Sequence, residues 1–383
     1  MEVARAEVPA DESSVADAVV RAQAEGRQLR AVGTGYSWSE AVGAGAVLVR
    51  TDRLRGVNTA DLAAGTAWIA AGTKLHEVCS ALWAEGMELP TLGGFSGQTI
   101  AGAISTATHG SGRRAACLSA YVQAVRLVDA AGSAVVVDGK RPEALQAARV
   151  GLGLLGVMTE VEVQVRPATW LRIDDSWHAH FDPRWLSADD GIRRAVRWHP
   201  LGQDGSPGMR FQLREWVPVA EDSVGALPSP AALATGGWEE PQPFAVVEHA
   251  LPLSGAAEAV EALTSALARE SDALSGMPLA LRVVAPDNAF LSPTQGEATM
   301  TISAAARSTS AGRGLFGLVH AALVSYGARP HWAKEHQYSS ETLRDRYSKL
   351  SRFETVRQTF DPHGMFLTPA MSDVLAGATE DLA

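Results

Sequence analysis

The sequence has few cysteines, no long hydrophobic run and no dense block of basic residues, and each absence excludes a class of protein. Cys79 and Cys117 are too few for a disulfide framework or, by themselves, for a structural zinc site. No apolar run reaches the roughly 18 residues of a membrane span, and the first residues, MEVARAEVPADESS, lack the basic and apolar parts of a secretory signal. The 33 basic side chains, against 43 acidic ones, form no cationic stripe. We therefore expect a cytoplasmic protein that binds neither nucleic acid nor a membrane.

The length and composition are those of a folded protein with two domains. The chain has 383 residues, a net charge of −10, 46% hydrophobic residues and 20% charged ones, and so long a chain seldom forms a single core. Of its 36 glycines, 20 precede residue 161, whereas six of its ten tryptophans fall between residues 170 and 238. This distribution predicts a first region that binds through its backbone and a second that binds through side chains.

Hydrophobic periodicity predicts a mixture of helices and strands, and therefore an α+β fold. Small and apolar side chains recur at helical spacing in residues 11–25, and residues 157–165 alternate as a half-buried strand does. Further helices are expected at 74–84, 254–270, 315–326 and 341–358, and further strands at 29–32, 47–49, 67–70, 121–128, 134–137, 244–249 and 279–284. Residues 223–243, which are rich in Pro, Gly, Ser and Ala, predict a loop.

Three glycine-containing segments are candidates for ligand contact. The turn at 33–37 (GTGYS) follows a strand, and small residues there can point backbone N–H groups at an anion, although a plain turn is the alternative. Residues 89–112 combine glycines and hydroxyl side chains with no charge between Glu88 and His109, which suits a large flat ligand better than a disordered linker. The GLGLLG of residues 151–156 matches a dinucleotide fingerprint, but a strand follows it, which excludes a Rossmann turn.

Together these segments resemble the vanillyl-alcohol-oxidase type of FAD enzymes, in the branch of aldonolactone and alditol oxidases. The resemblance runs over nearly the whole chain and is specific only as a set. Its segments are AVGTGYSWSE (31–40), LPTLGGFSGQTIAGAISTATHGSG (89–112), VGLGLLGVMTEVEVQV (150–165), FAVVEHALP (244–252), LALRVVAPDNAFLSP (279–293), RPHWAK (329–334) and VRQTFDPHGMF (356–366).

The resemblance implies a two-domain fold. The FAD domain would comprise residues 1–168 and the substrate domain, with a mixed or antiparallel sheet, residues 169–328. The segment 329–383 would return to the FAD domain. The turn at 33–37 looks like the pyrophosphate loop, residues 93–111 like the stretch along the pyrophosphate and isoalloxazine, and residues 151–157 like the adenine end.

The resemblance also implies the residues of the site. The expected cofactor-binding residues are Val32, Gly33, Thr34, Gly35, Tyr36, Ser37, Trp38, Gly93, Gly94, Ser96, Gly97, Thr99, Gly102, Ala103, Thr106, His109, Gly110, Ser111, Gly153, Gly156, Val157 and Lys334. The expected catalytic residues are Lys334, Arg282, His331 and Ser105.

Two departures from the family pattern bear on the chemistry. At the position of Tyr36 the family commonly has a histidine bonded covalently to the flavin, and a phenol cannot form that link. We therefore expect FAD to be held non-covalently, as in the decaprenylphosphoryl-ribose oxidases, which resemble this chain at this Tyr and at Lys334. In the strand at 279–284, alditol oxidases carry Glu-x-Arg, whereas this chain keeps Arg282 but has Ala280 in place of the Glu.

The loss of that Glu leaves the proton acceptor open between Lys334, His331 and His336. By resemblance, Lys334 lies beside flavin N5, where its charge can stabilise the reduced flavin, and Arg282 can orient a substrate oxygen or hold a carboxylate. His331 and His336 lie roughly 140° apart on a helix, so they would not share a metal-binding face and we expect no metal.

The leading hypothesis is an FAD-dependent oxidoreductase that oxidises a CH–OH group of a sugar, polyol or aldonolactone by hydride transfer to flavin N5. Dioxygen or another acceptor would then reoxidise the flavin. The alternative, suggested by Ala280, is a specialised tailoring oxidase of natural-product biosynthesis that acts on an amine or a non-sugar metabolite. A third possibility is a flavin-binding protein that has lost catalysis. The expected partner is a small-molecule substrate, and the expected oligomeric state is a monomer.

Overall fold

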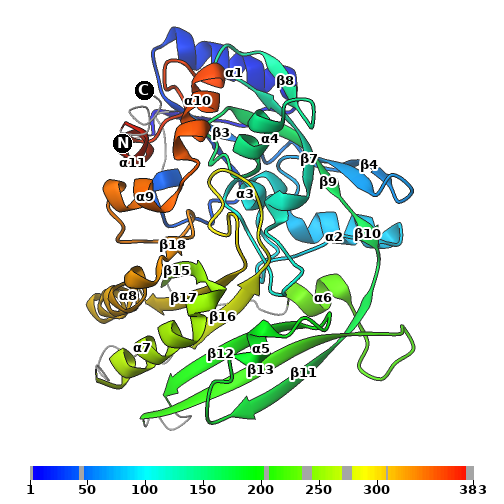
Figure 1. Cartoon of the computed structure of the whole chain (residues 1–383). Coiled ribbons are helices and arrows are strands. Elements are labelled where there is room, and N and C mark those ends of the chain that lie inside the picture. Colours follow the sequence, from blue (N-terminus) through cyan, green and yellow to red (C-terminus); the bar gives the residue numbers. More distant parts are fainter. Residues whose placement is uncertain are drawn as a thin grey trace.

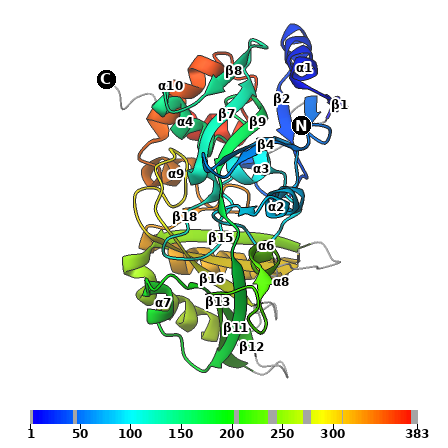
Figure 2. The ribbon, with the colours of Figure 1, turned by 90° about the vertical axis from the view of Figure 1, so that its right-hand side faces the viewer.

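The structure is a computed structural model that describes residues 3–42, 47–201, 207–234, 244–269, 278–307 and 309–376. The protein has two regions (Figure 1). The N-terminal and C-terminal parts of the chain form the first region, and the middle of the chain forms the second, a large sheet with its helices. Figure 2 shows the two regions stacked one above the other. No helix within the described ranges is long and apolar enough to cross a membrane.

Three sheets and four α-helices make up the described N-terminal part of the first region. Helix α1 (Glu12–Ala24) begins where the Asp11 carboxylate accepts a hydrogen bond from the Ser14 N–H at 2.8 Å. A parallel sheet has the strand order β1 (Arg5–Glu7), β3 (Val47–Arg50), β2 (Leu29–Val32). An antiparallel sheet has the order β4 (Val57–Asp61), β5 (Thr66–Ala70), β9 (Val157–Gln164), β7 (Val122–Val128), β8 (Ala134–Val137). The remaining elements are α2 (Leu75–Ala84), α3 (Ile100–Ser105), α4 (Pro142–Arg149) and the paired β6 (Met87–Glu88) and β10 (Arg166–Pro167).

Helix α3 lies inside the 89–112 segment, which showed little regular signal in the sequence. Thr99 caps it by accepting a hydrogen bond from the Gly102 N–H at 3.3 Å. Ile100, Ala103 and Ile104 recur at helical spacing and are fully buried. The glycines and hydroxyl residues around these three positions obscured the pattern, because a single helical turn offers few apolar positions.

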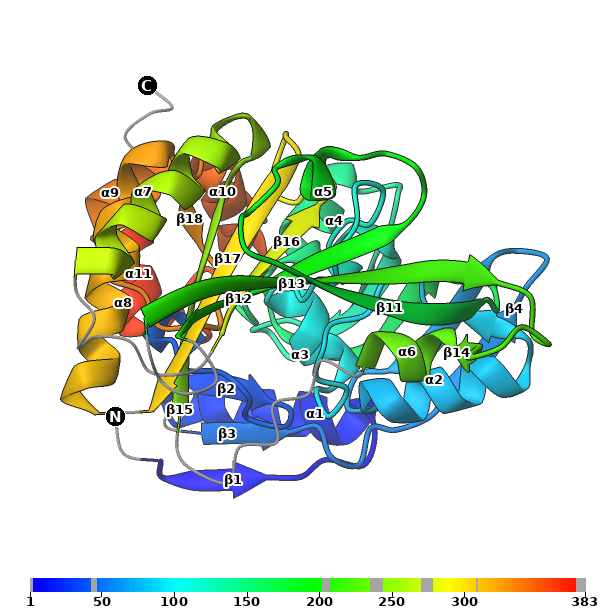
Figure 3. The same cartoon turned by 90° about the horizontal axis from the view of Figure 1, so that it is seen from below.

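The second region is an eight-stranded sheet in which every pair is antiparallel. Its strand order is β14 (Leu227–Pro228), β11 (Trp170–His178), β13 (Pro207–Val219), β12 (Arg193–Leu201), β16 (Leu279–Val284), β17 (Thr299–Arg307), β15 (Phe244–Pro252), β18 (Arg329–Pro330). Helices α7 (Ala256–Arg269) and α8 (Ser310–Leu323) pack on one face (Figure 3), and α5 (Arg184–Ser187) and α6 (Ser229–Ala234) are short. Alternation along each strand sends the other side chains to the opposite face, toward the first region.

The C-terminal segment packs against the N-terminal core through α9 (Ser340–Arg346), α10 (Leu350–Phe360) and α11 (Pro369–Leu375). The prediction of one helix over 341–358 is wrong, because the chain breaks between α9 and α10. Tyr347 is buried at the break and donates its hydroxyl hydrogen to the Pro330 carbonyl at 3.0 Å.

The prediction of a loop at 223–243 is also wrong in part, because β14 and α6 form there. Residues 235–243 of that prediction lie outside the described residues. The predicted boundaries after residues 168 and 328 lie just before the first residue of β11 and the first residue of β18. Strand β18, assigned in advance to the C-terminal segment, completes the edge of the large sheet through its pairing with β15.

Candidate active site

A cavity of about 380 Å³ lies between the end of β2, helix α3 and the start of β9. Glycines and short side chains line it, so much of its wall is backbone. The predicted cofactor-binding residues on this wall are Val32, Gly33, Thr34, Gly35, Tyr36, Ser37, Thr99, Gly102, Thr106, Gly153 and Gly156. Three segments that are far apart in the sequence therefore meet around one cavity.

The turn at 33–37 packs closely against the residue that caps α3. A Cβ atom at Gly33 would overlap the side chain of Thr99, so a larger residue would push into the wall. Thr34 donates its hydroxyl hydrogen to the Gly97 carbonyl at 2.7 Å, which ties the turn to the segment before α3.

Hydrogen-bond donors on the same wall fit the phosphates of FAD. Among the described residues, none accepts a hydrogen bond from the backbone N–H groups of residues 34–37. Thr51 Oγ1 and Arg30 Nε are buried there without a partner in the described chain. The other Arg30 nitrogens donate to the carbonyls of Leu152 at 2.6 Å and Phe366 at 2.7 Å. Burial lowers the pKa of Arg30 to about 10, so the guanidinium keeps its charge at neutral pH beside these donors.

A second cavity of about 110 Å³ adjoins the first, and Tyr36, Gln98 and Thr106 line both. The other predicted site residues on its wall are Gly93, Gly94, His109, Arg282, His331 and Lys334. The structure thus gathers three of the four expected catalytic residues beside the glycine-lined cavity.

Aromatic rings lie against the side chain of Lys334. Its Nζ is 4.6 Å from the centroid of the Trp38 ring and 5.5 Å from that of Tyr36, which is within cation–π range. Burial lowers the pKa of Lys334 to about 8, with Arg282 acting in the same direction and Glu248 against it. A lysine with this pKa can both accept and release a proton near neutral pH.

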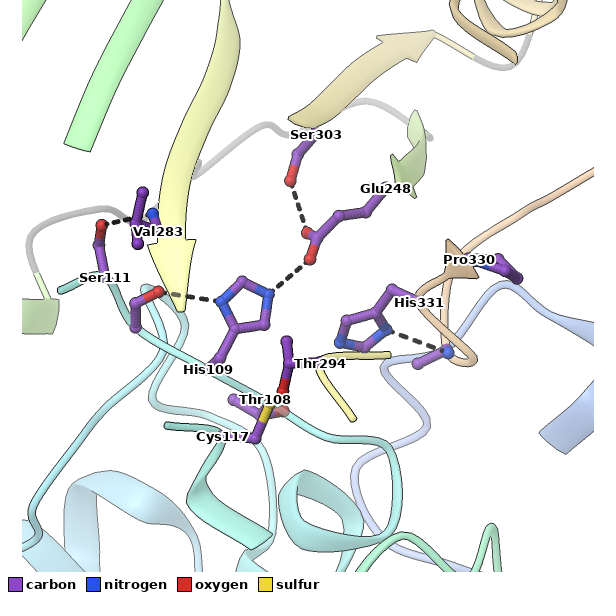
Figure 4. A network of polar contacts seen from close by, with 12 residues as sticks. Thr108, His109, Ser111, Cys117, Glu248, Val283, Thr294, Ser303, Pro330 and His331 are labelled. Carbon is purple, nitrogen blue, oxygen red and sulfur yellow. Dashed lines mark hydrogen bonds and ion pairs between the residues drawn. The ribbon is translucent and has the colours of Figure 1, made fainter. Parts of the chain in front are cut away.

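The smaller cavity also contains a carboxylate, Glu248, which is not among the site residues expected from the sequence (Figure 4). Glu248 on β15 is 5% exposed and stands in register with Ser303 of β17, which pairs in turn with Ala280 of β16. Ser303 donates its hydroxyl hydrogen to Glu248 Oε2 at 2.5 Å. A carboxylate is therefore present in the same row of the sheet as Ala280, two strands away. Its signal in the sequence was a single acidic residue inside the apolar strand FAVVEHALP.

His109 and Glu248 form a buried pair. His109 Nε2 lies 2.5 Å from Glu248 Oε1, and Nδ1 lies 2.9 Å from the carbonyl oxygen of Gly110. Because a carbonyl oxygen only accepts, Nδ1 carries a proton, and a second proton lies between Nε2 and the carboxylate. Burial by itself raises the pKa of Glu248. The positive charge of His109 and its hydrogen bond outweigh that effect, and the pKa of Glu248 lies well below its ordinary value.

His331 is a neutral neighbour of this pair. Its Nδ1 accepts a hydrogen bond from the Ala333 N–H at 3.2 Å, so the ring proton is on Nε2. Burial lowers the pKa of His331 to about 3. The ring is therefore a hydrogen-bond donor toward the cavity and a poor base at neutral pH.

A metal ion is the alternative occupant of this cluster. His109, Glu248 and His331 each offer a possible ligand atom, and within the described chain these atoms lie within 4.8 Å of one another. The Ala333 N–H occupies the lone pair of His331, however. The 2.5 Å between His109 and Glu248 is also shorter than the separation of two ligands bound at about 2.0–2.2 Å to one ion. Their hydrogen bonds suit proton chemistry better than metal binding.

Comparisons with known proteins agree with this geometry. A family model described as an FAD binding domain matches residues 4–138, and one described as D-arabinono-1,4-lactone oxidase matches residues 239–374. The chain is 28% identical to L-gulono-1,4-lactone dehydrogenase of Mycobacterium tuberculosis and 28% identical to alditol oxidase of a Streptomyces species. In each case the match covers 96% of this chain and 95% of the relative.

The chain belongs to the vanillyl-alcohol-oxidase type of FAD enzymes, in the aldonolactone and alditol oxidase branch. It is an FAD-dependent oxidoreductase. The fold of this flavoenzyme is also that of 6-hydroxy-D-nicotine oxidase from Arthrobacter nicotinovorans, with a TM-score of 0.72 at 17% identity, over 94% of this chain and 90% of that one.

Two candidate catalytic residues of the flavoenzyme, Ser105 and His336, do not line the cavity of Lys334. Ser105, expected near the substrate, lines the larger cavity and donates its hydroxyl hydrogen to Met158 Sδ at 3.9 Å. The turn of α3 directs it toward β9, so its position fits cofactor contact and not the expected catalytic role. His336, one of the three candidate bases, packs against Tyr338 on the other side of β15.

Some expected cofactor residues line neither of the two cavities. Gly110 and Ser111 line a third, smaller one. Ala103 and Val157 are fully buried in hydrophobic cores, where they hold α3 and β9 in place. Ser96 and Gly97 act through their carbonyl oxygens, which accept hydrogen bonds from His76 and Thr34.

Proposed function

We propose that the enzyme oxidises a CH–OH group of a sugar, polyol or aldonolactone, with Lys334 as the proton acceptor. The observation that carries this proposal is the cavity in which Lys334 and the His109–Glu248 pair stand together, beside the wall that fits FAD. The names of the relatives, which include a lactone dehydrogenase and an alditol oxidase, support the same class of substrate.

FAD, when bound, supplies the hydride acceptor. The carbinol must lose its hydroxyl proton as its hydride leaves, and a base with a pKa near the working pH does this best. Lys334, whose pKa is about 8, meets that condition, whereas burial lowers the pKa of His331 to about 3 and its Nδ1 already accepts a hydrogen bond from the Ala333 N–H. Accepting the proton makes Lys334 an ammonium ion, and the Glu248 carboxylate then stabilises that charge. Glu248 also has lone pairs left to orient the substrate hydroxyl.

We propose that FAD is held without a covalent bond. Tyr36 stands at the junction of the two cavities, its ring stacked on Phe95 at 4.1 Å, and burial raises the pKa of its phenol. Neither described cavity has a cysteine on its wall. His109 and His331 do line the smaller one, but both ring nitrogens of His109 are hydrogen-bonded, and Nδ1 of His331 accepts a hydrogen bond from the Ala333 N–H. We also propose that one chain suffices, because all of these residues come from a single copy.

Purification followed by acid precipitation tests the cofactor. A yellow protein whose colour passes into the supernatant is expected, and colour that stays in the pellet would contradict non-covalent binding. Anaerobic bleaching of the flavin by alditols, aldonolactones and amines tests the substrate class. Bleaching by amines alone, or by no compound, would contradict oxidation of a carbinol.

A further inference from the structure

A third cavity, of about 50 Å³, opens beside the cavity of Lys334, and the two share Gly94, Ala280 and Arg282. Its wall contains three arginines, Arg197, Arg214 and Arg282, and no acidic residue among the described ones. A concave wall that carries only positive charges favours an anionic ligand.

The register of the sheet brings these cations together. Arg197 of β12 pairs with Ala280 of β16, and Ala195 of β12 pairs with Arg282. Because side chains two residues apart point to the same face, both arginines face the site, each opposite an alanine. The short alanine side chains leave the space between the guanidinium groups open.

Two of the three arginines form no ion pair with a described residue. The Asp175 carboxylate accepts two hydrogen bonds from Arg214, at 2.8 Å and 2.7 Å. Neither Arg197 nor Arg282 makes a hydrogen bond or ion pair with any other described residue. Burial, together with Arg214 and Arg282, lowers the pKa of Arg197 from its ordinary value, and the Asp175 carboxylate that is bonded to Arg214 acts against that shift.

Glu248, the acidic residue on the neighbouring wall, does not neutralise these cations. It is bonded to His109 and Ser303. Two half-buried guanidinium groups that form no direct ion pair with a described residue are costly to the folded protein, since each has lost part of its hydration. A ligand with anionic oxygens would offset that cost, and guanidinium groups bind carboxylates and phosphates through paired hydrogen bonds.

We propose that the substrate is an anionic alcohol, whose carboxylate or phosphate binds Arg197 and Arg282 while its carbinol reaches Lys334. This inference rests on the proposed oxidation of a CH–OH group. It adds a substrate class, hydroxy acids and phosphorylated polyols, and it assigns Arg197, which no sequence motif indicated, to substrate binding.

A matched set of six-carbon compounds tests it: sorbitol, gluconate and sorbitol 6-phosphate. Anaerobic reduction of the holoenzyme flavin would be followed against concentration to give an apparent Kd for each. We expect at least one anion to bind about 10-fold or more tightly than sorbitol, and to weaken as salt rises. The stronger of the two anions identifies carboxylate or phosphate as the bound group. Equal or tighter binding of sorbitol would overturn the inference and leave the proposed oxidation standing.

Substitution of the arginine sharpens the test. Arg197→Met should raise the apparent Kd of the anion about 10- to 100-fold and leave sorbitol within about 2-fold, because only the anion uses the charge. Arg114→Met, at an exposed arginine paired with Asp189, is the matched control. Arg197→Lys keeps the charge and should recover part of the loss, which guards against a folding defect. Equal loss for anion and sorbitol in both Arg197 variants would contradict substrate contact.

Calorimetry separates this inference from the proposed function. If no compound reduces the flavin, gluconate and inorganic phosphate would be titrated into the holoenzyme and its Arg197→Met variant. Binding that the variant loses supports the anion site even though the oxidation proposal has failed. Absence of binding to the unsubstituted holoenzyme would overturn the anion site itself.

Discussion

The larger cavity and the cavity of Lys334 differ in what lines them. The larger one is lined mostly by glycines and short side chains from residues 30–39, 98–106 and 152–158, together with Leu48 and Thr51. The smaller one places Lys334 beside Glu248, His109 and Arg282, which come from separate strands and loops. The backbone has the same chemical groups in every residue, so the shape of a wall made of backbone depends on which positions are glycine. A cluster of side chains depends instead on which distant residues the sheet brings into register.

Loss of the base should give the largest effect. Lys334→Met removes the proton acceptor, so anaerobic flavin reduction should slow about 10²- to 10⁴-fold while the larger cavity still binds FAD. In the unsubstituted enzyme the reduction rate should rise with pH and level off above about 8, because Lys334 accepts a proton only when neutral. The variant should lose that rise. Lys140→Met, at an exposed turn, is the control. An unchanged reduction rate in the Lys334 variant would remove this residue from the chemistry.

Glu248→Gln should have the next largest effect, a slowing of flavin reduction by about 100-fold with unchanged FAD content. Glu248 raises the pKa of Lys334, so its removal should also move the rise of the pH–rate profile to lower pH. A merely structural role for Glu248 predicts no such shift. The exposed Glu258→Gln on α7 should leave both rate and profile alone.

The backbone wall should respond to a single methyl group. Gly33→Ala would push a Cβ atom into the side chain of Thr99, so FAD affinity should fall about 10-fold or more, as measured by fluorescence titration of the apoprotein. At saturating FAD the reduction rate should recover, because the cluster around Lys334 is untouched. Gly139→Ala, where a Cβ atom would meet no atom of the described residues within 4 Å, is the control. Tight FAD binding in the Gly33 variant would show that the wall tolerates more than backbone.

The smallest effect concerns the opposite face of the substrate sheet. Burial lowers the pKa of His249 to about 3 and of His336 to about 4. In the unfolded chain these rings take up a proton below the ordinary histidine pKa of about 6.5, whereas in the folded protein they stay neutral until the pH falls to about 4 or 3. The folded state therefore has its full stability above about pH 6.5 and loses stability as the pH falls below that value. Each ring contributes up to ~1.4 kcal/mol per pH unit. His336→Gln should make urea unfolding less sensitive to pH between 7.5 and about 5, whereas the exposed His363→Gln should not. Equal slopes in both variants would contradict the assignment.

Much of the fold followed from local patterns. Helix α1 and strand β9 were predicted to within about one or two residues, because each carries a full period of buried positions. Helix α3 and the break at Tyr347 were not predicted. The first is too short to show a period, and the second depends on a hydrogen bond to Pro330, which is distant in the sequence.

The sequence by itself determined the part of this protein that fits the cofactor. The glycine-containing turns that line the larger cavity are contiguous segments, and their conformational freedom follows from the residue type alone. It also supplied Lys334 and Arg282 through a family resemblance. Only the tertiary structure decided the substrate side. Glu248, Ser303, Ala280 and Arg197 lie on four strands, and antiparallel register places them in one row across the sheet. Register is set by long-range pairing, so the carboxylate in the row of Ala280, and the arginine that forms no ion pair with a described residue, could be found only in the folded chain.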